Sequence, residues 1–171
     1  AYYLAKPYVK GDLLELGCGE GRGVELLSPL AQSYLALDKI QEVIDRLKEK
    51  HPKVDFQQAV FPPFQTLEDN SFDSVVSFQV IEHIKDDKSF LKEIYRVLKP
   101  GGIAVLTTPN IKKTLTRNPW HVREYTAEQL TQLASQIFPK VTMKGVGGNE
   151  KVMKYYEQNK ESVRRITRFD I

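Results

Sequence analysis

A glycine-rich segment near the start of the chain, E-L-G-C-G-E-G, has the residue types of a ligand-binding turn. It spans Glu15 to Gly21 and follows an apolar run, D-L-L-E-L, which predicts a strand over 12–16. Alternate glycines let the backbone turn sharply and approach a ligand closely, and the amino terminus of the next helix faces the same crevice. The segment therefore predicts a cofactor site at the end of the first strand.

The spacing of these glycines distinguishes between two classes of nucleotide cofactor. Dinucleotide sites use G-x-G-x-x-G, and counting from Gly17 the third glycine of that pattern would fall on Arg22. The chain instead has G-x-G-x-G, with Glu15 two residues before the first glycine. That carboxylate would repel a pyrophosphate but attract the ammonium group of a methionine moiety. The pattern therefore favours S-adenosyl-L-methionine over NAD.

Asp38 is the second candidate for cofactor contact. It follows the second expected strand, Ser33 to Leu37, and lies about twenty residues beyond the glycine turn. A carboxylate at this position can accept hydrogen bonds from both ribose hydroxyls. An NAD site or a helix N-cap would explain an aspartate here equally well, so Asp38 supports the assignment only together with the glycine spacing.

Strand-sized apolar runs alternate along the chain with helix-sized amphipathic segments. This alternation predicts an α/β fold with a doubly wound, Rossmann-like, mostly parallel sheet and helices on both faces. Pro100-Gly101-Gly102 is expected to end a helix and turn into the fifth strand. The strands are expected over 12–16, 33–37, 54–60, 72–78, 103–107 and 141–146. The helices are expected from 40 to 47 and over 87–98, 127–137 and 150–168.

The organisation after the fifth strand is different. Residues 109–124 predict a long polar connection, of a length that is typical of functional loops, and Thr126 is a suitable N-cap for the helix that follows. A seventh strand is not evident. We expect one domain over 1–171, with sequence missing at one or both ends.

Composition excludes several kinds of site and partner. No run approaches the roughly 20 apolar residues that span a bilayer. Cys18 is the single cysteine, which excludes an internal disulfide and a zinc site built from several cysteines, and favours the reducing cytoplasm. The net charge of +3 is mild, so a nucleic-acid partner is not expected.

In combination, these motifs and two further ones resemble the class I S-adenosylmethionine-dependent methyltransferases, in particular those with a type 11-like domain. The further motifs are Phe72-Asp73 and R-V-L-K-P-G-G at 96–102, and the resemblance runs from about Gly11 to Asn110. It implies a seven-stranded sheet, with the glycine turn around the methionine half of the cofactor and Asp38 on its ribose. It also places Lys39 and Ile40 beside the adenine.

One position departs from the family pattern. The family usually has an aspartate after the third strand that accepts a hydrogen bond from the adenine amino group, and this chain has Gln58, followed by Ala59. A glutamine carbonyl can still accept that bond, so we expect weaker or differently posed adenine recognition. The expected cofactor contacts are Glu15, Gly17, Cys18, Gly19, Gly21, Asp38, Lys39, Ile40, Gln58, Ala59 and Gln79.

The catalytic candidates on the acceptor side are Glu82, His83 and His121. Methyl transfer is an in-line displacement, so the protein must align the acceptor atom, and an oxygen acceptor also needs a base or a metal. Glu82 and His83 follow the fourth strand, where such a pair can also simply brace a loop. His121 lies in the long connection, and a neutral imidazole titrates in the useful range for a base.

The same residues resemble two metal-using branches of the family, the small-RNA 2′-O-methyltransferases and the O-methyltransferases of ubiquinone biosynthesis. Carried over by position, Glu82, His83 and His121 would be ligands of Mg²⁺. The branches have a further glutamate where this chain has Gln79, and losing an anionic ligand weakens a hard-cation site. We therefore expect no resident metal, and His121 to line the acceptor pocket.

The expected function is methyl transfer from S-adenosyl-L-methionine to an oxygen of a small molecule or glycan in the cytoplasm. Three alternatives stay open: a non-catalytic binding or scaffold module with this fold, a small-RNA 2′-O-methyltransferase, and an NAD-dependent oxidoreductase. The sequence names neither the acceptor nor the oligomeric state.

Overall fold

The computed structural model describes residues 1–64, 66–116 and 118–167, and its internal contacts divide the chain into two compact units. The first unit covers residues 1–108 and the second covers 109–171. Each unit is described by itself below, and the expected single domain over 1–171 stays a prediction.

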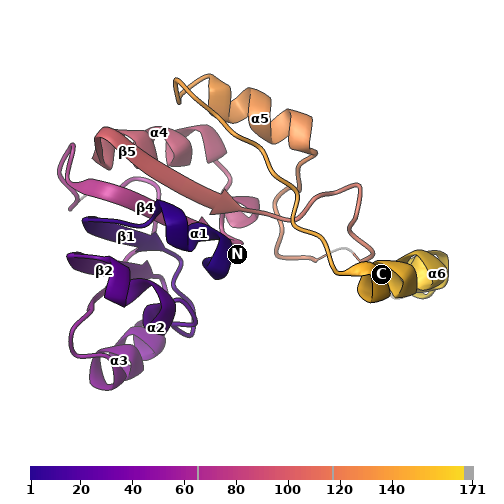
Figure 1. Ribbon diagram of the computed structural model, residues 1–171, viewed down its shortest axis with the longest axis horizontal. Coiled ribbons are helices and arrows are strands. Elements are labelled where there is room, and N and C mark those ends of the chain that lie inside the picture. Colours follow the sequence, from indigo (N-terminus) through magenta and orange to yellow (C-terminus); the bar gives the residue numbers. More distant parts are fainter. Residues whose placement is uncertain (65, 117, 168–171) are drawn as a thin grey trace. The chain divides into compact units, whose positions relative to one another are not determined.

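The first unit is built on a parallel sheet of five strands in the order β3-β2-β1-β4-β5 (Figure 1). Every neighbouring pair is parallel. The doubly wound α/β fold predicted from the sequence is confirmed. The strands are β1 (Asp12–Leu16), β2 (Ser33–Asp38), β3 (Asp55–Gln58), β4 (Phe72–Phe78) and β5 (Leu98–Thr107).

The central strands are apolar on both faces because helices cover both. Leu13, Leu14 and Leu16 of β1 are fully buried, as are Val75 and Val76 of β4. A parallel sheet requires this pattern, since its crossover connections place helices against each face. The continuous apolar runs seen in the sequence therefore form the middle of the sheet.

Two crossover helices lie on opposite faces of the sheet. Helix α3 (Gln41–Lys50) connects β2 to β3, and helix α4 (Asp87–Val97) connects β4 to β5. The two crossovers run in opposite directions along the sheet, and right-handed connections then place their helices on opposite faces. Shorter helical turns are α1 (Tyr2–Ala5), η1 (Lys6–Tyr8), α2 (Val24–Leu27), η2 (Ser28–Leu30) and η3 (Ile81–His83).

The fifth strand begins earlier than the sequence indicates. Helix α4 ends at Val97 and β5 starts at Leu98, so the expected turn at 100–102 lies inside the strand. Leu98 pairs with Phe72 and Ile103 pairs with Ser74, which leaves four residues of β5 opposite one residue of β4. This is a bulge, where the extra residues bend the strand instead of ending it.

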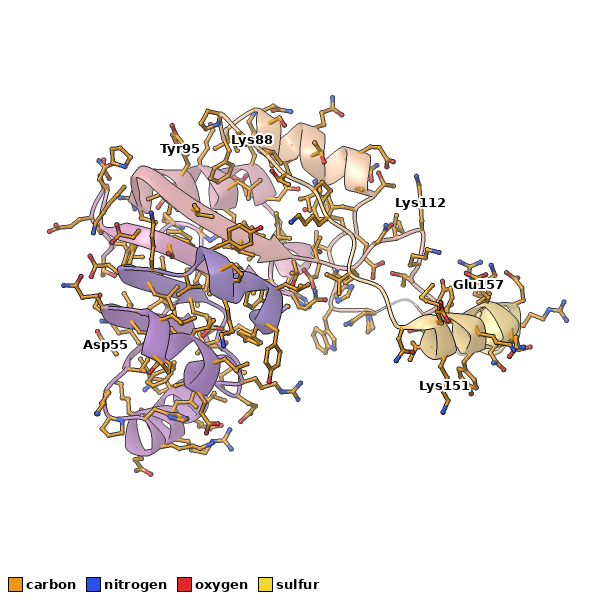
Figure 2. All side chains as sticks on the ribbon, viewed as in Figure 1. Asp55, Lys88, Tyr95, Lys112, Lys151 and Glu157 are labelled. Atoms are coloured by element: carbon orange, nitrogen blue, oxygen red, sulfur yellow. The ribbon has the colours of Figure 1, made fainter. Side chains whose placement is uncertain are left out.

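The second unit contains α5 (Ala127–Ser135) and α6 (Glu150–Thr167). Thr126 caps α5 as predicted, because its side chain accepts from the backbone of Gln129 and the Gln129 side chain accepts in return. Lys151 and Glu157 project from opposite sides of α6 (Figure 2). Arg168, the expected end of this helix, lies outside the described residues.

The sixth strand predicted over 141–146 is wrong. The described chain has neither helix nor strand between 139 and 149. Its β-branched residues favour extended backbone, but a strand forms only where a neighbouring strand pairs with it, and Gly145, Gly147 and Gly148 weaken the segment further. Nowhere in the described ranges is there a helix both long and apolar enough to cross a bilayer.

A charged cluster joins β1, β4 and β5 at the amino edge of the sheet. The Lys99 ammonium lies 2.6 Å from Asp12 Oδ2 and 2.7 Å from Asp73 Oδ2, and the Asp73 carboxylate also accepts from the Asp12 backbone N–H at 2.9 Å. Hydrogen bonding to Lys99 lowers the pKa of both carboxyl groups. The cluster therefore stabilises the fold while both aspartates are ionised.

Replacing Lys99 by methionine should lower the Tm at about pH 7 and leave a smaller difference from the unmutated protein at about pH 3. The folded pKa of Asp12 and Asp73 is depressed, so their contribution is present above the unfolded pKa of about 3.9 and is lost as the pH falls. Thermal unfolding followed by circular dichroism measures both effects, with the exposed Lys48→Met as control. A difference that is constant with pH would contradict the assignment.

Candidate functional site

The carboxyl ends of all the described strands meet at one edge of the sheet. Leu16 pairs with Ser77, Asp38 with Gln58, and Phe78 with Thr107. The chain leaves β1 toward β2 on one side and returns to β4 on the other, so the strand order reverses at β1. Open parallel sheets bind ligands at such a switch point, and the glycine turn lies there.

The glycine turn is held against the end of β2. The backbone N–H groups of Gly17 and Cys18 donate to the Leu37 carbonyl at 2.8 and 3.1 Å. Gly17 has a φ of +76°, and a Cβ at this residue would lie 2.4 Å from Val80 Cγ2, so a side chain is excluded there. At Gly19, with a φ of +49°, no described atom lies within 4 Å of the Cβ position. A ligand can therefore approach the backbone at Gly19.

Asp38 ties this turn to β2. Its Oδ2 accepts from the Gly19 N–H at 2.9 Å, and its Oδ1 accepts from the Ile40 N–H at 3.1 Å. The residue is 9% exposed. Each carboxylate oxygen has two lone pairs, so both oxygens retain capacity for ribose hydroxyls. The two acceptor oxygens and their position at the strand end fit the hydroxyls of the ribose of a nucleoside cofactor.

The residues expected around the adenine lie next to Asp38. Gln58 is its partner across the sheet, and the Ala59 N–H donates to the Asp38 carbonyl at 2.9 Å. The Gln58 amide nitrogen donates to the Lys39 carbonyl at 3.1 Å, which leaves Oε1 as the group that Gln58 can offer to an amino group. Ile40 is 45% exposed and presents apolar surface at the same edge.

Cys18 contributes its backbone to this turn. Its side chain is 3% exposed, and burial raises the pKa of the thiol to about 12. The group is therefore protonated and shielded from solvent, so no thiolate chemistry is expected from it.

Glu15 lies in an environment that the sequence did not indicate. Its side chain is 1% exposed and accepts from Tyr2 Oη at 2.9 Å through Oε1, and from Tyr34 Oη through Oε2. Burial raises the pKa of Glu15, and the two tyrosine hydrogen bonds oppose that change. The carboxylate is thus enclosed instead of open, and its expected part in binding an ammonium group stays a prediction.

The segment after β4 has a constrained backbone. Gln79 has a φ of +60°, which is rare outside glycine and often marks functional sites. Its N–H donates to the Thr107 carbonyl at 2.9 Å, and its side-chain amide donates to Thr107 Oγ1 at 3.1 Å. These bonds join the ends of β4 and β5 and position the next turn, η3.

The turn η3 places Glu82 and His83 in different environments. Glu82 is fully buried, and its Oε2 accepts from Thr108 Oγ1 at 2.9 Å. Its Oε1 has no hydrogen-bond partner among the described atoms. His83 is exposed. A buried carboxylate oxygen without a partner is costly, which indicates that Glu82 is placed to receive a donor or a cation.

His121 belongs to the second unit and forms an ordered network there. Its Nδ1 lies 2.7 Å from Glu124 Oε1, and its Nε2 lies 3.0 Å from the Asn118 amide nitrogen. Glu124 Oε2 also accepts from Thr114 Oγ1. An amide that donates to Nε2 assigns the proton to Nδ1, which then donates to Glu124. The result is a carboxylate–imidazole pair in which Nε2 carries the lone pair.

Sequence reasoning missed several partners of these residues. Glu124 could have been found, because it lies three positions after His121 in the sequence. Tyr2, Tyr34 and Thr108 could not, since no local spacing links them to Glu15 or Glu82.

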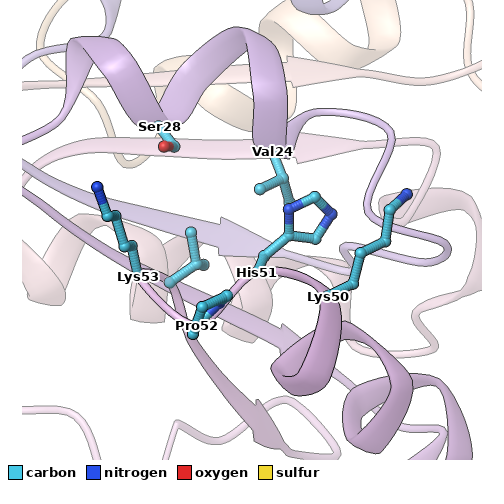
Figure 3. Close-up of a pocket in the computed structure, with 7 residues that line it drawn as sticks. Val24, Ser28, Lys50, His51, Pro52 and Lys53 are labelled. Atoms are coloured by element: carbon cyan, nitrogen blue, oxygen red, sulfur yellow. The ribbon is translucent and has the colours of Figure 1, made fainter.

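Two surface pockets lie on the first unit. One, of about 230 Å³, is formed where α3 ends and β3 begins, and is lined by Val24, Ser28 and residues 50–54 (Figure 3). The other, of about 350 Å³, is lined by Pro62, Pro63, Asp86 and the α4 residues Ser89, Lys92 and Glu93. None of the site residues predicted from the sequence lines either pocket, so neither bears on the assignment.

Comparison with known proteins places this geometry in context. Residues 14–106 match the family model of the methyltransferase domain. A protein of Mycolicibacterium smegmatis named "Probable S-adenosylmethionine-dependent methyltransferase" is 39% identical over 71% of this chain and 49% of its own length. The mitochondrial ubiquinone biosynthesis O-methyltransferase of Rattus norvegicus is 34% identical over 61% of this chain and 32% of its own length.

Solved structures agree on the fold. The S-adenosylmethionine-dependent methyltransferase from Mesorhizobium loti superposes with a TM-score of 0.72, at 17% identity, over 95% of this chain and 91% of that one. The chain spans about half the length of the Mycolicibacterium smegmatis relative and about a third of the length of the Rattus norvegicus relative.

Asp38→Ala should weaken the binding of S-adenosylhomocysteine on the order of a hundredfold or more, because two hydrogen bonds to a charged group are lost. The Gly19 N–H also loses its acceptor, so the turn itself is less well held. Isothermal titration calorimetry measures the change, and Asp45→Ala, an exposed aspartate of α3, is the control. Affinity that stays within a few-fold of the starting value would contradict the site assignment.

Proposed function

Since this chain belongs to the class I S-adenosylmethionine-dependent methyltransferases, we propose that it transfers a methyl group from that cofactor to an oxygen of a small molecule or glycan. The observation that carries the cofactor half is the Asp38 carboxylate, bonded to the Gly19 N–H at the switch point of the sheet. The observation that carries the acceptor half is the hydrogen-bonded pair of His121 and Glu124.

When bound, S-adenosyl-L-methionine supplies an electrophilic methyl group on a sulfonium. The residues of this chain hold and orient the cofactor. Asp38 accepts hydrogen bonds from the ribose hydroxyls, and the backbone at Gly19 allows the cofactor to approach closely. Gln58 offers Oε1 to the adenine amino group, and Ile40 offers apolar surface. Alignment of this kind lowers the entropic part of the barrier to an in-line displacement.

An oxygen acceptor must also lose a proton. His121 can take it at Nε2, because Glu124 accepts a hydrogen bond from the Nδ1–H group and stabilises the imidazolium that forms. The Asn118 amide covers Nε2 in the absence of an acceptor, and an acceptor hydroxyl would replace that donor. The oxygen–carbon bond forms as the carbon–sulfur bond breaks, and the proton moves to Nε2.

Relatives support oxygen as the acceptor atom. The ubiquinone biosynthesis O-methyltransferases of Rattus norvegicus and Homo sapiens are each 34% identical over 61% of this chain. The net charge of +3 gives little support to the RNA alternative, because RNA binding rests on many cationic contacts. The single, buried Cys18 supports the cytoplasm as the compartment.

A metal-assisted version is the second candidate. Glu82 Oε1, buried and without a partner among the described atoms, is the observation that favours it. Gln79 in place of a further carboxylate disfavours it. Comparing turnover after treatment with EDTA and after addition of Mg²⁺ decides between a base alone and a metal.

His121→Ala should lower methyl transfer about a hundredfold or more while S-adenosylhomocysteine affinity stays within about threefold. Glu124→Gln should lower turnover less, because the imidazole remains but loses its charged partner. The assay follows labelled methyl from S-adenosyl-L-methionine into a panel containing 3,4-dihydroxybenzoate, simple phenols and methyl glycosides. His51→Ala, which removes a histidine at the opposite edge of the sheet, is the control.

Each failure has a separate meaning. Full turnover by the His121→Ala variant would show that His121 is not the general base. Cofactor binding by the unmutated protein without transfer to any acceptor would favour the scaffold alternative. Transfer to an oligoribonucleotide, with binding that weakens steeply with salt, would favour the RNA alternative.

A further inference from the structure

Tyr2, Glu15 and Tyr34 form a hydrogen-bonded cluster that the mechanism above does not use. Tyr2 Oη donates to Glu15 Oε1 at 2.9 Å, and Tyr34 Oη donates to Oε2. Glu15 is 1% exposed and Tyr34 is 5% exposed, whereas Tyr2 lies only partly buried. Of the three residues, Tyr2 is therefore the one with surface that a molecule outside the cluster can contact.

Tyr2 lies at the carboxyl edge of the sheet, beside the glycine turn. Its ring packs edge-on against Phe78 at the end of β4, with centroids 4.7 Å apart. A Cβ on Gly23, just before α2, would lie 2.2 Å from the Tyr2 ring, so the ring fits only because that residue is glycine. Tyr2 thus contacts the ends of β1 and β4 and the start of α2, which together border the predicted methionine half of the cofactor.

The enclosed carboxylate needs both tyrosines. A carboxylate in an apolar interior is costly unless hydrogen bonds stabilise it. Burial raises the pKa of Glu15 while the hydroxyls of Tyr34 and Tyr2 lower it, so each donor favours the charged form. Burial, with the nearby Glu15 carboxylate, also raises the pKa of both tyrosines, which therefore remain protonated donors.

A hydroxyl that donates its proton keeps its lone pairs as acceptors. When Tyr2 donates to Glu15, its oxygen becomes more negative and can accept an N–H from a cation on the outer side. A charge buried behind the tyrosine can in this way act on a ligand that never touches the carboxylate.

We propose that Tyr2 is the residue through which this chain recognises the ammonium group of S-adenosyl-L-methionine, with Glu15 behind it as the charged partner and Tyr34 as the support of Glu15. The proposal rests on the cofactor assignment of the proposed function. It accounts for a fully enclosed Glu15 next to the glycine turn, and it makes α1 part of the cofactor site.

The test compares two ligands that differ in the amino-acid moiety. S-adenosylhomocysteine carries the ammonium group, and 5′-methylthioadenosine lacks the whole amino-acid end. Tyr2→Phe should weaken S-adenosylhomocysteine about tenfold and leave 5′-methylthioadenosine within about twofold, both measured by calorimetry. Tyr3→Phe, on the same helix and 74% exposed, is the matched control and should change neither affinity.

Two further variants show whether the three residues act together. Tyr34→Phe should also reduce only S-adenosylhomocysteine affinity, through Glu15. Glu15→Gln should do the same, and adding Tyr2→Phe to it should cost less than Tyr2→Phe alone, because the two residues act as a unit. Circular dichroism and thermal unfolding establish that each variant is folded.

An equal loss for both ligands in Tyr2→Phe would overturn the proposal, since it would mean that Tyr2 only supports the fold. Unchanged or tighter S-adenosylhomocysteine binding would overturn it as well, and tighter binding would mean that Tyr2 obstructs the site. If the unmutated protein bound neither ligand, the cofactor assignment itself would fail, which is a different result.

Discussion

The site depends on one set of hydrogen bonds, between the glycine turn after β1 and the end of β2. The Leu37 carbonyl accepts from Gly17 and Cys18, and the Asp38 carboxylate accepts from Gly19. These bonds hold the turn in a left-handed backbone that only glycine adopts at little cost. The parallel register then brings Gln58 beside Asp38, so the polar groups that fit a nucleoside follow from the pairing of β1, β2 and β3.

The same edge contains polar groups that an apolar core would exclude. Glu15 and Glu82 are enclosed, the first with two tyrosine donors and the second with one oxygen unpaired among the described atoms. Groups of this kind do not contribute to stability as apolar side chains in the same positions would. The amino edge differs, because the Lys99 cluster there is partly exposed and joins strands without enclosing an unpaired group. Buried polar groups that lower the stability of the fold are typical of functional sites.

The relatives establish the family and leave the acceptor open. The matched segment, 14–106, lies entirely in the first unit, which also contains the residues proposed to bind the cofactor. The His121–Glu124 pair lies in the second unit, beyond that segment. The residues proposed to bind the cofactor therefore lie within the first unit, and the pair proposed as the base lies outside the segment that matches the family model.

The sequence by itself determined the α/β class, the place of the glycine turn after the first strand, the place of Asp38 at the end of the second strand, and most of the strands. These follow from local spacing, since a strand, a turn and the residue after it are set by neighbours along the chain. Only the tertiary structure decided that Glu15 is enclosed by Tyr2 and Tyr34, which lie 13 and 19 positions away. It also decided that 141–146 is not a strand, and that Glu82 is buried while His83 is exposed. Pairing and burial depend on segments distant in sequence, and periodicity carries no information about which segments meet.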